Sequence, residues 1–167
     1  MPYRNFGAYK MDEISLKSHL AMRVSEFGAR WNSIESDIYA KHKEEDEALR
    51  QTYPGDEYHY VAGTDWFEIF GERIEPLFDH YCTDKRRVYG GKGPRSFGFP
   101  SKFNGVENPT ETLVEIKTKT RAEVLVKTQT RFQDEYLFVF LKKTGEWKID
   151  SYKSRRYGGE VWDSRIL

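Results

Sequence analysis

Hydrophobic residues recur with helical spacing through the first third of the chain. Successive members of this stripe are three or four residues apart, which is the period of one buried helix face. We therefore predict one long amphipathic helix, capped at its start by Asp12 or Ser15. The acidic run at 44–47 lacks a stripe, so it either extends this helix in solvent or begins a loop. The members of the stripe are Leu16, Leu20, Val24, Phe27, Trp31, Ile34 and Ile38.

A second helical pattern follows a break at residues 53–56, where a proline and a glycine are adjacent. Asp65 followed three residues later by Glu68 is typical of a helix start, because each side chain can bond a free backbone N–H. Pro76 falls inside the pattern, and its ring predicts a kink or a split into a pair of shorter helices. The apolar positions are Phe67, Phe70, Ile74, Leu77, Phe78 and Tyr81.

The spacing changes to that of strands in the last third of the chain. Val124 and Val126 alternate with polar neighbours, as in a half-solvated strand, and a glycine-containing turn at 143–146 predicts a hairpin. Before these strands, residues 85–103 are rich in glycine, proline and basic residues, which predicts a long loop with a short strand near 87–89. The predicted strands are 113–117, 122–128, 136–141 and 147–152.

The order of elements predicts an α+β fold in one domain over residues 1–167. Helices come first and a meander follows, and its short linkers favour antiparallel pairing. We expect a long N-terminal helix and a second helical pair to pack on a curved antiparallel sheet of about four strands.

Composition narrows the class of protein. The chain has 167 residues, of which 38% are hydrophobic and 32% charged, so it is neither disordered nor a membrane protein. Lys and Arg equal Asp and Glu at 27 each, which argues against a protein that coats nucleic acid. One cysteine, Cys82, allows no internal disulfide, and the first residues lack a signal-peptide layout, so we expect a cytoplasmic location.

The sequence offers no convincing catalytic or metal-binding set. Asp150 alternates with Ile149, so it should face solvent if Ile149 faces the core. No two of the four histidines are spaced as metal ligands, and Cys82 lacks an identifiable base, which favours a buried structural cysteine. The glycine-rich segment 88–95 is not a phosphate loop, because the motif ends in Gly-Lys followed by Ser or Thr, and here Gly93 and then Pro94 follow Lys92. We predict no catalytic residue, metal or cofactor.

The segment 85–102 is the most nucleic-acid-like part of the chain. It carries basic residues and no acidic ones, interleaved with Tyr89, Phe97 and Phe99. Because the whole chain is neutral, we favour a solvated basic loop over a nucleic-acid site.

Tyrosine, tryptophan and arginine gather in two other stretches, and these residue types are enriched at protein-binding hot spots. We take them as candidates for contact with a protein partner, while noting that several can instead pack under loops. These candidates are Tyr58, Tyr60, Trp66, Tyr152, Arg155, Arg156, Tyr157 and Trp162.

The C-terminal hairpin carries a resemblance to a known family. Residues 136–151 run from a hydrophobic strand through a glycine-containing turn into Trp147-Lys148-Ile149-Asp150, and this resembles the last hairpin of the nuclear-transport-factor-2-like (NTF2-like) superfamily. Within it, the aromatic-rich ending 151–162 is most similar to the immunity proteins of bacterial polymorphic toxin systems. The shared plan covers residues 12–162 and implies a cone, in which the helix closes the wide face of a bent sheet.

The resemblance also implies a function. Such a protein binds the C-terminal domain of a cognate toxin delivered by a neighbouring cell and neutralises it, in contact-dependent competition between bacteria. Those toxins are often nucleases, so the toxin rather than this chain contacts nucleic acid. Acidic residues at 44–47, 56–57 or 111 would then mimic phosphates. No membrane partner is implied, and the chain is a monomer or a homodimer.

Two rival hypotheses use the same fold. In the first, the chain is a small-molecule isomerase, dehydratase or cyclase with a polar pocket inside the cone. A cone filled with phenylalanine, tryptophan and leucine would argue against that enzyme. In the second, the chain is a scaffold or dimerisation module that pairs through an open sheet face.

Overall fold

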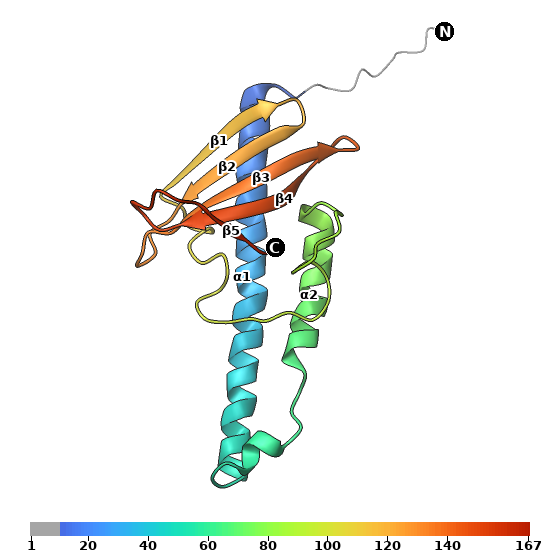
Figure 1. Cartoon of the computed structure of the whole chain (residues 1–167), viewed down its shortest axis with the longest axis vertical. Helices are drawn as coiled ribbons and strands as arrows, with labels where there is room; N and C mark the ends of the chain where they lie inside the picture. Colours follow the sequence, from blue (N-terminus) through green and yellow to red (C-terminus); the bar gives the residue numbers. More distant parts are fainter. Residues whose placement is uncertain (1–10) are drawn as a thin grey trace, which may run out of the picture.

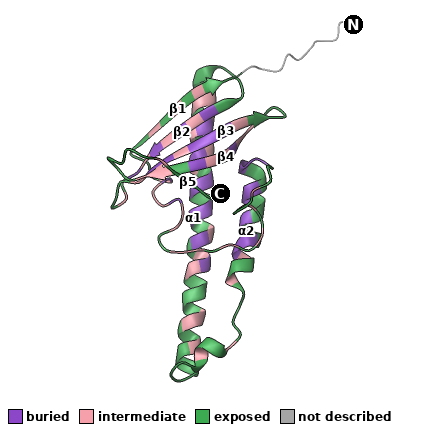
Figure 2. Cartoon of the chain, viewed as in Figure 1, coloured by how far each residue is buried: buried purple, intermediate pink, exposed green. Residues whose placement is uncertain are grey.

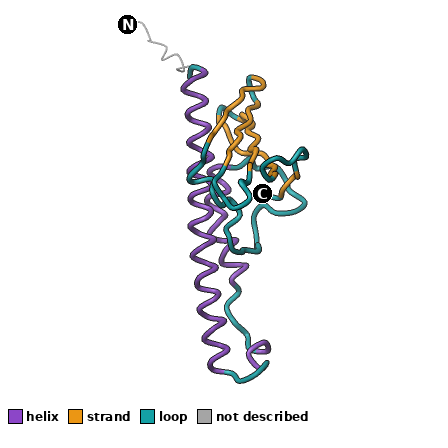
Figure 3. The backbone as a smooth tube through the Cα atoms, turned by 90° about the vertical axis from the view of Figure 1, so that its left-hand side faces the viewer, coloured by secondary structure: helices purple, strands orange, loops and turns teal. Residues whose placement is uncertain are grey.

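The computed structural model describes residues 11–167 and places two helices on one face of an antiparallel sheet (Figures 1 and 3). The five strands are hydrogen-bonded in the order in which they occur along the chain. This arrangement confirms the predicted α+β fold. The elements are α1 (Glu13–Thr52), the short 3-10 helix η1 (Glu57–Tyr60), α2 (Trp66–Tyr81), β1 (Glu111–Thr118), β2 (Arg121–Lys127), β3 (Glu135–Lys143), β4 (Glu146–Arg155) and β5 (Asp163–Arg165).

Helix α1 follows the predicted stripe and is longer than the sheet it covers. Asp12 caps its start, because its carboxylate accepts a hydrogen bond from the Ser15 backbone N–H at 2.7 Å. The acidic run 44–47 continues the helix, so the first of the two expectations for that run is correct. Figure 2 shows buried residues beside the sheet and mainly exposed ones on the far half of α1. The buried apolar members are Leu20, Val24, Phe27, Trp31 and Ile38.

Helix α2 remains one helix in spite of Pro76, so the prediction of a split helical pair is wrong. Asp65 caps its start by accepting from the Glu68 backbone N–H at 3.0 Å, as the sequence predicts. Pro76 lies on the exposed side, where its ring meets solvent instead of the sheet. The second helical piece is η1, which lies before α2 in the chain.

The sheet confirms the four predicted strands and adds β5, a strand of three exposed residues. The predicted strand near 87–89 does not form. A bulge interrupts the pairing of β3 with β4, because Val139 lies opposite Ser151 while Phe140 lies opposite Ile149. Asp150 is the extra residue, and its insertion turns both Ile149 and Tyr152 toward the helices.

The space between the helices and the sheet is filled with aromatic side chains. Phe103, which comes from the long loop after α2, lies at the centre of this cluster. Its ring centroid is 5.2 Å from those of Phe27 and Trp31, and 5.1 Å from that of Tyr152. Cys82 is buried at the edge of the cluster, and burial raises the pKa of its thiol to about 12, in agreement with a structural cysteine.

The loop backbone passes so close to α2 that a side chain cannot fit between them. A Cβ atom at Gly71 would lie 2.1 Å from the carbonyl oxygen of Gly93. We therefore predict that Gly71→Ala lowers the free energy of unfolding by about 2 kcal/mol or more, although alanine favours helices. Urea unfolding followed by circular dichroism measures this change.

Gly98→Ala is the matched control for that substitution. Gly98 lies in the loop that passes α2, but a Cβ there meets no atom within 4 Å. We expect a change within about 0.5 kcal/mol. Equal losses at Gly71 and Gly98 would contradict the close contact.

Candidate functional site

Two polar residues beside the aromatic cluster, Glu35 and Lys102, are engaged by other groups of the protein. The Glu35 carboxylate is buried and accepts hydrogen bonds from Trp31 Nε1 at 3.0 Å and from the Lys102 backbone N–H at 2.7 Å. The Lys102 ammonium lies 5.2 Å from the Trp31 ring centroid, and burial lowers the pKa of this lysine to about 8. With rings filling the rest of the interior, this arrangement does not resemble the polar pocket that the isomerase-like hypothesis requires.

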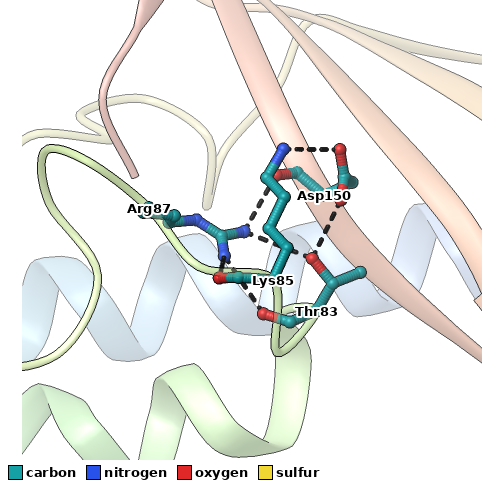
Figure 4. Close-up of polar contacts among 4 residues, drawn as sticks. All are labelled: Thr83, Lys85, Arg87 and Asp150. Carbon is teal, nitrogen blue, oxygen red and sulfur yellow. Dashed lines mark hydrogen bonds and ion pairs between the residues drawn. The ribbon is translucent and has the colours of Figure 1, made fainter.

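Asp150 lies at the bulge of β4, and Figure 4 shows its side chain beside those of Thr83, Lys85 and Arg87. Its carboxylate accepts hydrogen bonds from Thr83 Oγ1 at 2.9 Å and Lys85 Nζ at 2.7 Å, while Arg87 donates to its backbone oxygen at 2.8 Å. The side chain is 15% exposed. Asp150 therefore points away from the core, as predicted, but it is tied to the loop after α2 instead of being free in solvent.

Opposing effects set the pKa of Asp150. Burial acts to raise it, but hydrogen bonds from Lys85 and Thr83 and the charges of Lys85 and Arg87 outweigh burial and hold the pKa below its usual range. At neutral pH the group is thus an anion that joins β4 to the loop, which is a structural role.

Metal binding finds no support in the part of the chain that the structure describes. Residues 11–167 contain no group of three or more His, Cys, Asp or Glu side chains placed to hold a metal ion. Within the same range, no helix is both long and apolar enough to cross a membrane.

The basic loop 85–102 is less solvated than the sequence predicts. The Arg95 guanidinium lies 4.8 Å from the Trp31 ring centroid, and that of Arg87 lies 5.0 Å from the Phe78 ring centroid. These cations, with Lys102, cover the aromatic interior, and Arg87 also lines a small pocket at the end of α2. Tyr89 and Phe99 remain exposed.

The first predicted group of contact residues lies at the far end of α1, around η1. Trp66 is half-buried and donates its indole N–H to the Glu45 carboxylate. Tyr58 is also half-buried, with the Arg50 guanidinium 5.0 Å from its ring centroid. Tyr60 is 89% exposed. We call residues 44–68 the acidic tip, because this range holds eight Asp and Glu residues and a single arginine.

One member of the second predicted group, Tyr152, lies in the core. Arg131 and Phe132, which the sequence did not indicate, lie beside the other members. Tyr152 is 5% exposed and packs against Phe103, so its ring is not at the surface. The others lie at the end of β4, beside the turn that precedes β3. There, the Tyr157 backbone N–H donates to the Phe132 oxygen at 3.4 Å. We call this surface the arginine–aromatic patch, made of Arg131, Phe132, Arg155, Arg156, Tyr157 and Trp162.

Arginine side chains hold the rings of the arginine–aromatic patch in place. The Arg156 guanidinium lies 4.3 Å from the Phe132 ring centroid, and the Arg155 guanidinium lies 4.2 Å from that of Trp162. Arg155 is fixed in turn, because its Nε donates to the buried Glu135 carboxylate at 2.7 Å. The patch therefore presents guanidinium groups beside aromatic rings, one of which, that of Arg155, is held by an ion pair, and Tyr157 is 72% exposed.

The ion pair at the bulge yields a pH-dependent prediction. The pKa of Asp150 is lower in the folded chain than in the unfolded chain, where it is about 3.9. Ionised Asp150 therefore stabilises the fold fully above the unfolded pKa, and this contribution is lost as pH falls through the folded pKa. At pH 7, Asp150→Asn should lower the free energy of unfolding by about 1–2 kcal/mol. This difference should shrink below about pH 4, which urea unfolding across a pH series measures.

The exposed neighbour Asp84 provides the control for Asp150. We expect Asp84→Asn to change the free energy of unfolding by less than about 0.5 kcal/mol at either pH. A loss for Asp150→Asn that persists undiminished at low pH would rule out the ionic explanation.

Comparison with known proteins places the chain in a family. Residues 55–164 match the model of the NTF2 fold immunity proteins, a range that includes both predicted contact groups, α2 and nearly all of the sheet. No curated protein and no solved structure gives a match. The matched range exceeds half of the 167 residues, so the chain belongs to the family of NTF2 fold immunity proteins.

Proposed function

We propose that this chain binds the C-terminal domain of a cognate bacterial toxin and neutralises it by direct contact. Membership of the immunity family is the observation that carries the proposal. In this account the chain acts in the cytoplasm of a bacterium, as a monomer or homodimer, during contact-dependent competition. The closed aromatic interior supports a role that depends on the outer surface.

The arginine–aromatic patch is the surface that we propose for the toxin contact. It combines exposed rings with the guanidinium of Arg155, which Glu135 holds in place, so this side chain would lose little further freedom on docking. Tyr, Trp and Arg dominate binding hot spots because they bury large areas and still donate hydrogen bonds. The acidic tip is the rival surface, and it would suit a basic, nuclease-like toxin.

Affinity capture tests the proposed function. The tagged chain is expressed in its native host, and proteins that co-purify in stoichiometric amount are identified by mass spectrometry. We expect the C-terminal fragment of a large secreted protein. Recovery of the chain alone, under conditions in which a candidate toxin is expressed, would count against the proposal.

Substitutions in the arginine–aromatic patch test the contact surface. Arg156→Ala and Tyr157→Ala should each weaken binding to the captured toxin domain by roughly ten-fold or more, measured by calorimetry. Tyr89→Ala is the matched control, because Tyr89 is a similarly exposed tyrosine on a different loop. Its affinity should stay within about two-fold of the wild type.

The same measurements distinguish the rival surface. If the toxin docks on the acidic tip, Tyr60→Ala weakens binding while the patch substitutions do not. Affinity would then also fall steeply with added salt. That pattern would move the contact to the tip and leave the proposed function intact.

A further inference from the structure

A wide groove lies at the end of the sheet away from the arginine–aromatic patch. It is bounded by the start of α1, the end of α2 and the tips of the β1–β2 and β3–β4 hairpins, all of which lie in the upper half of Figure 1. Its volume is 1210 Å³. Because pockets for small ligands typically measure about 300–1,000 Å³, this groove suits a stretch of polypeptide better.

The floor of the groove is apolar. Leu16, Ile116 and Trp147 line it, and all three are partly buried side chains that pack against the core. They come from α1, β1 and β4, so the core itself fixes their relative positions. A partner's apolar side chain that covered them would gain burial at little cost in ordering this chain.

The carboxylates that line the groove are already paired. Each of the three has a lysine within ion-pair distance, so their charges are largely compensated inside the chain. The pairs are Glu13 with Lys17 at 3.0 Å, Asp79 with Lys92, and Glu146 with Lys148 at 3.7 Å.

Three cations that line the groove have no such compensation. Arg23, Lys119 and Lys142 form no ion pair with any carboxylate of residues 11–167. Residues 1–10 contain no Asp or Glu, so the remaining sequence cannot supply one. The groove therefore carries uncompensated positive charge around an apolar floor.

Arg23 is held at the groove wall. Its Nη2 donates to the His80 backbone oxygen at 2.9 Å, and its guanidinium lies 4.8 Å from the Tyr81 ring centroid. Its Nε is buried without an acceptor among the described residues. A guanidinium fixed in this way loses little conformational freedom when a carboxylate binds it.

We infer that this groove binds an acidic segment of the partner polypeptide. Carboxylates of that segment pair with Arg23, Lys119 and Lys142, and an apolar side chain covers the floor beside Trp147. The identity of the partner rests on the proposed function, in which it is the toxin domain, and the groove is then a second contact for that domain in addition to the arginine–aromatic patch. Residues 1–10 of this chain fit poorly, because they carry Arg4 and Lys10 and would add positive charge.

Neighbouring lysines on the β3–β4 hairpin provide a matched test. Lys142 lines the groove and Lys143 does not, although both are exposed at the same hairpin. Against the captured toxin domain, Lys142→Glu and Lys119→Glu should each weaken binding by roughly five- to ten-fold, and Lys143→Glu by less than about two-fold. Equal effects at Lys142 and Lys143, or none, would overturn the inference.

A titration that does not need the toxin separates this inference from the proposed function. The probe is an eight-residue peptide, Asp-Glu-Leu-Asp-Trp-Glu-Leu-Asp, added to the ¹⁵N-labelled full chain and followed by NMR. We expect shifts at Arg23, Ile116 and the Trp147 indole, and none with the peptide in which Asn and Gln replace the acids. If the acidic peptide shifts these signals but no toxin domain is captured, the proposed function is refuted and the groove inference stands.

Two further outcomes complete the test. Toxin binding that is insensitive to Lys142→Glu, together with no peptide shifts at the groove, would overturn the groove inference and leave the proposed function standing. Deletion of residues 2–10 should leave the affinity within about two-fold. A large gain in affinity would identify that segment as the occupant and would also overturn the inference.

Discussion

Two polar side chains on α1 determine how the long loop after α2 is placed. Asn32 binds the Phe103 backbone on both sides, since its Nδ2 donates to the Phe103 oxygen at 2.8 Å and its Oδ1 accepts from the N–H at 3.1 Å. One turn later, Glu35 accepts from the backbone N–H groups of Gly98 and Lys102 at 3.0 and 2.7 Å. Because a buried polar group is costly unless it is hydrogen-bonded, these bonds require the helix and the loop to stay together.

This constraint has consequences for the whole molecule. The loop can carry Phe103 into the space between helix and sheet only because Asn32 and Glu35 satisfy its backbone there. The ring then closes the interior, and Arg95 and Lys102 cover it from outside. Fold relatives that act as enzymes need that interior for a ligand. In this chain aromatic side chains fill it, which supports the proposal that the outer surfaces bind the partner.

The sequence predicts those features that depend on periodic burial. The stripe of α1, the Asp65 cap and the four long strands follow from spacing alone. Features that depend on pairing between distant segments were missed or wrong. The three exposed residues of β5 have no alternation, Phe132 gains its role only from the register of β3 with β4, and the bulge at Asp150 turns Tyr152 inward. Pro76 does not split α2, because the helix accommodates its ring on an exposed side.

Growth rescue tests whether this chain neutralises a toxin. The toxic C-terminal domain recovered with this chain is expressed from an inducible promoter in a sensitive bacterial strain, with and without the chain. The account predicts that the toxin domain alone stops growth and that the wild-type chain restores it. Continued killing in the presence of folded, equally abundant chain would contradict the account.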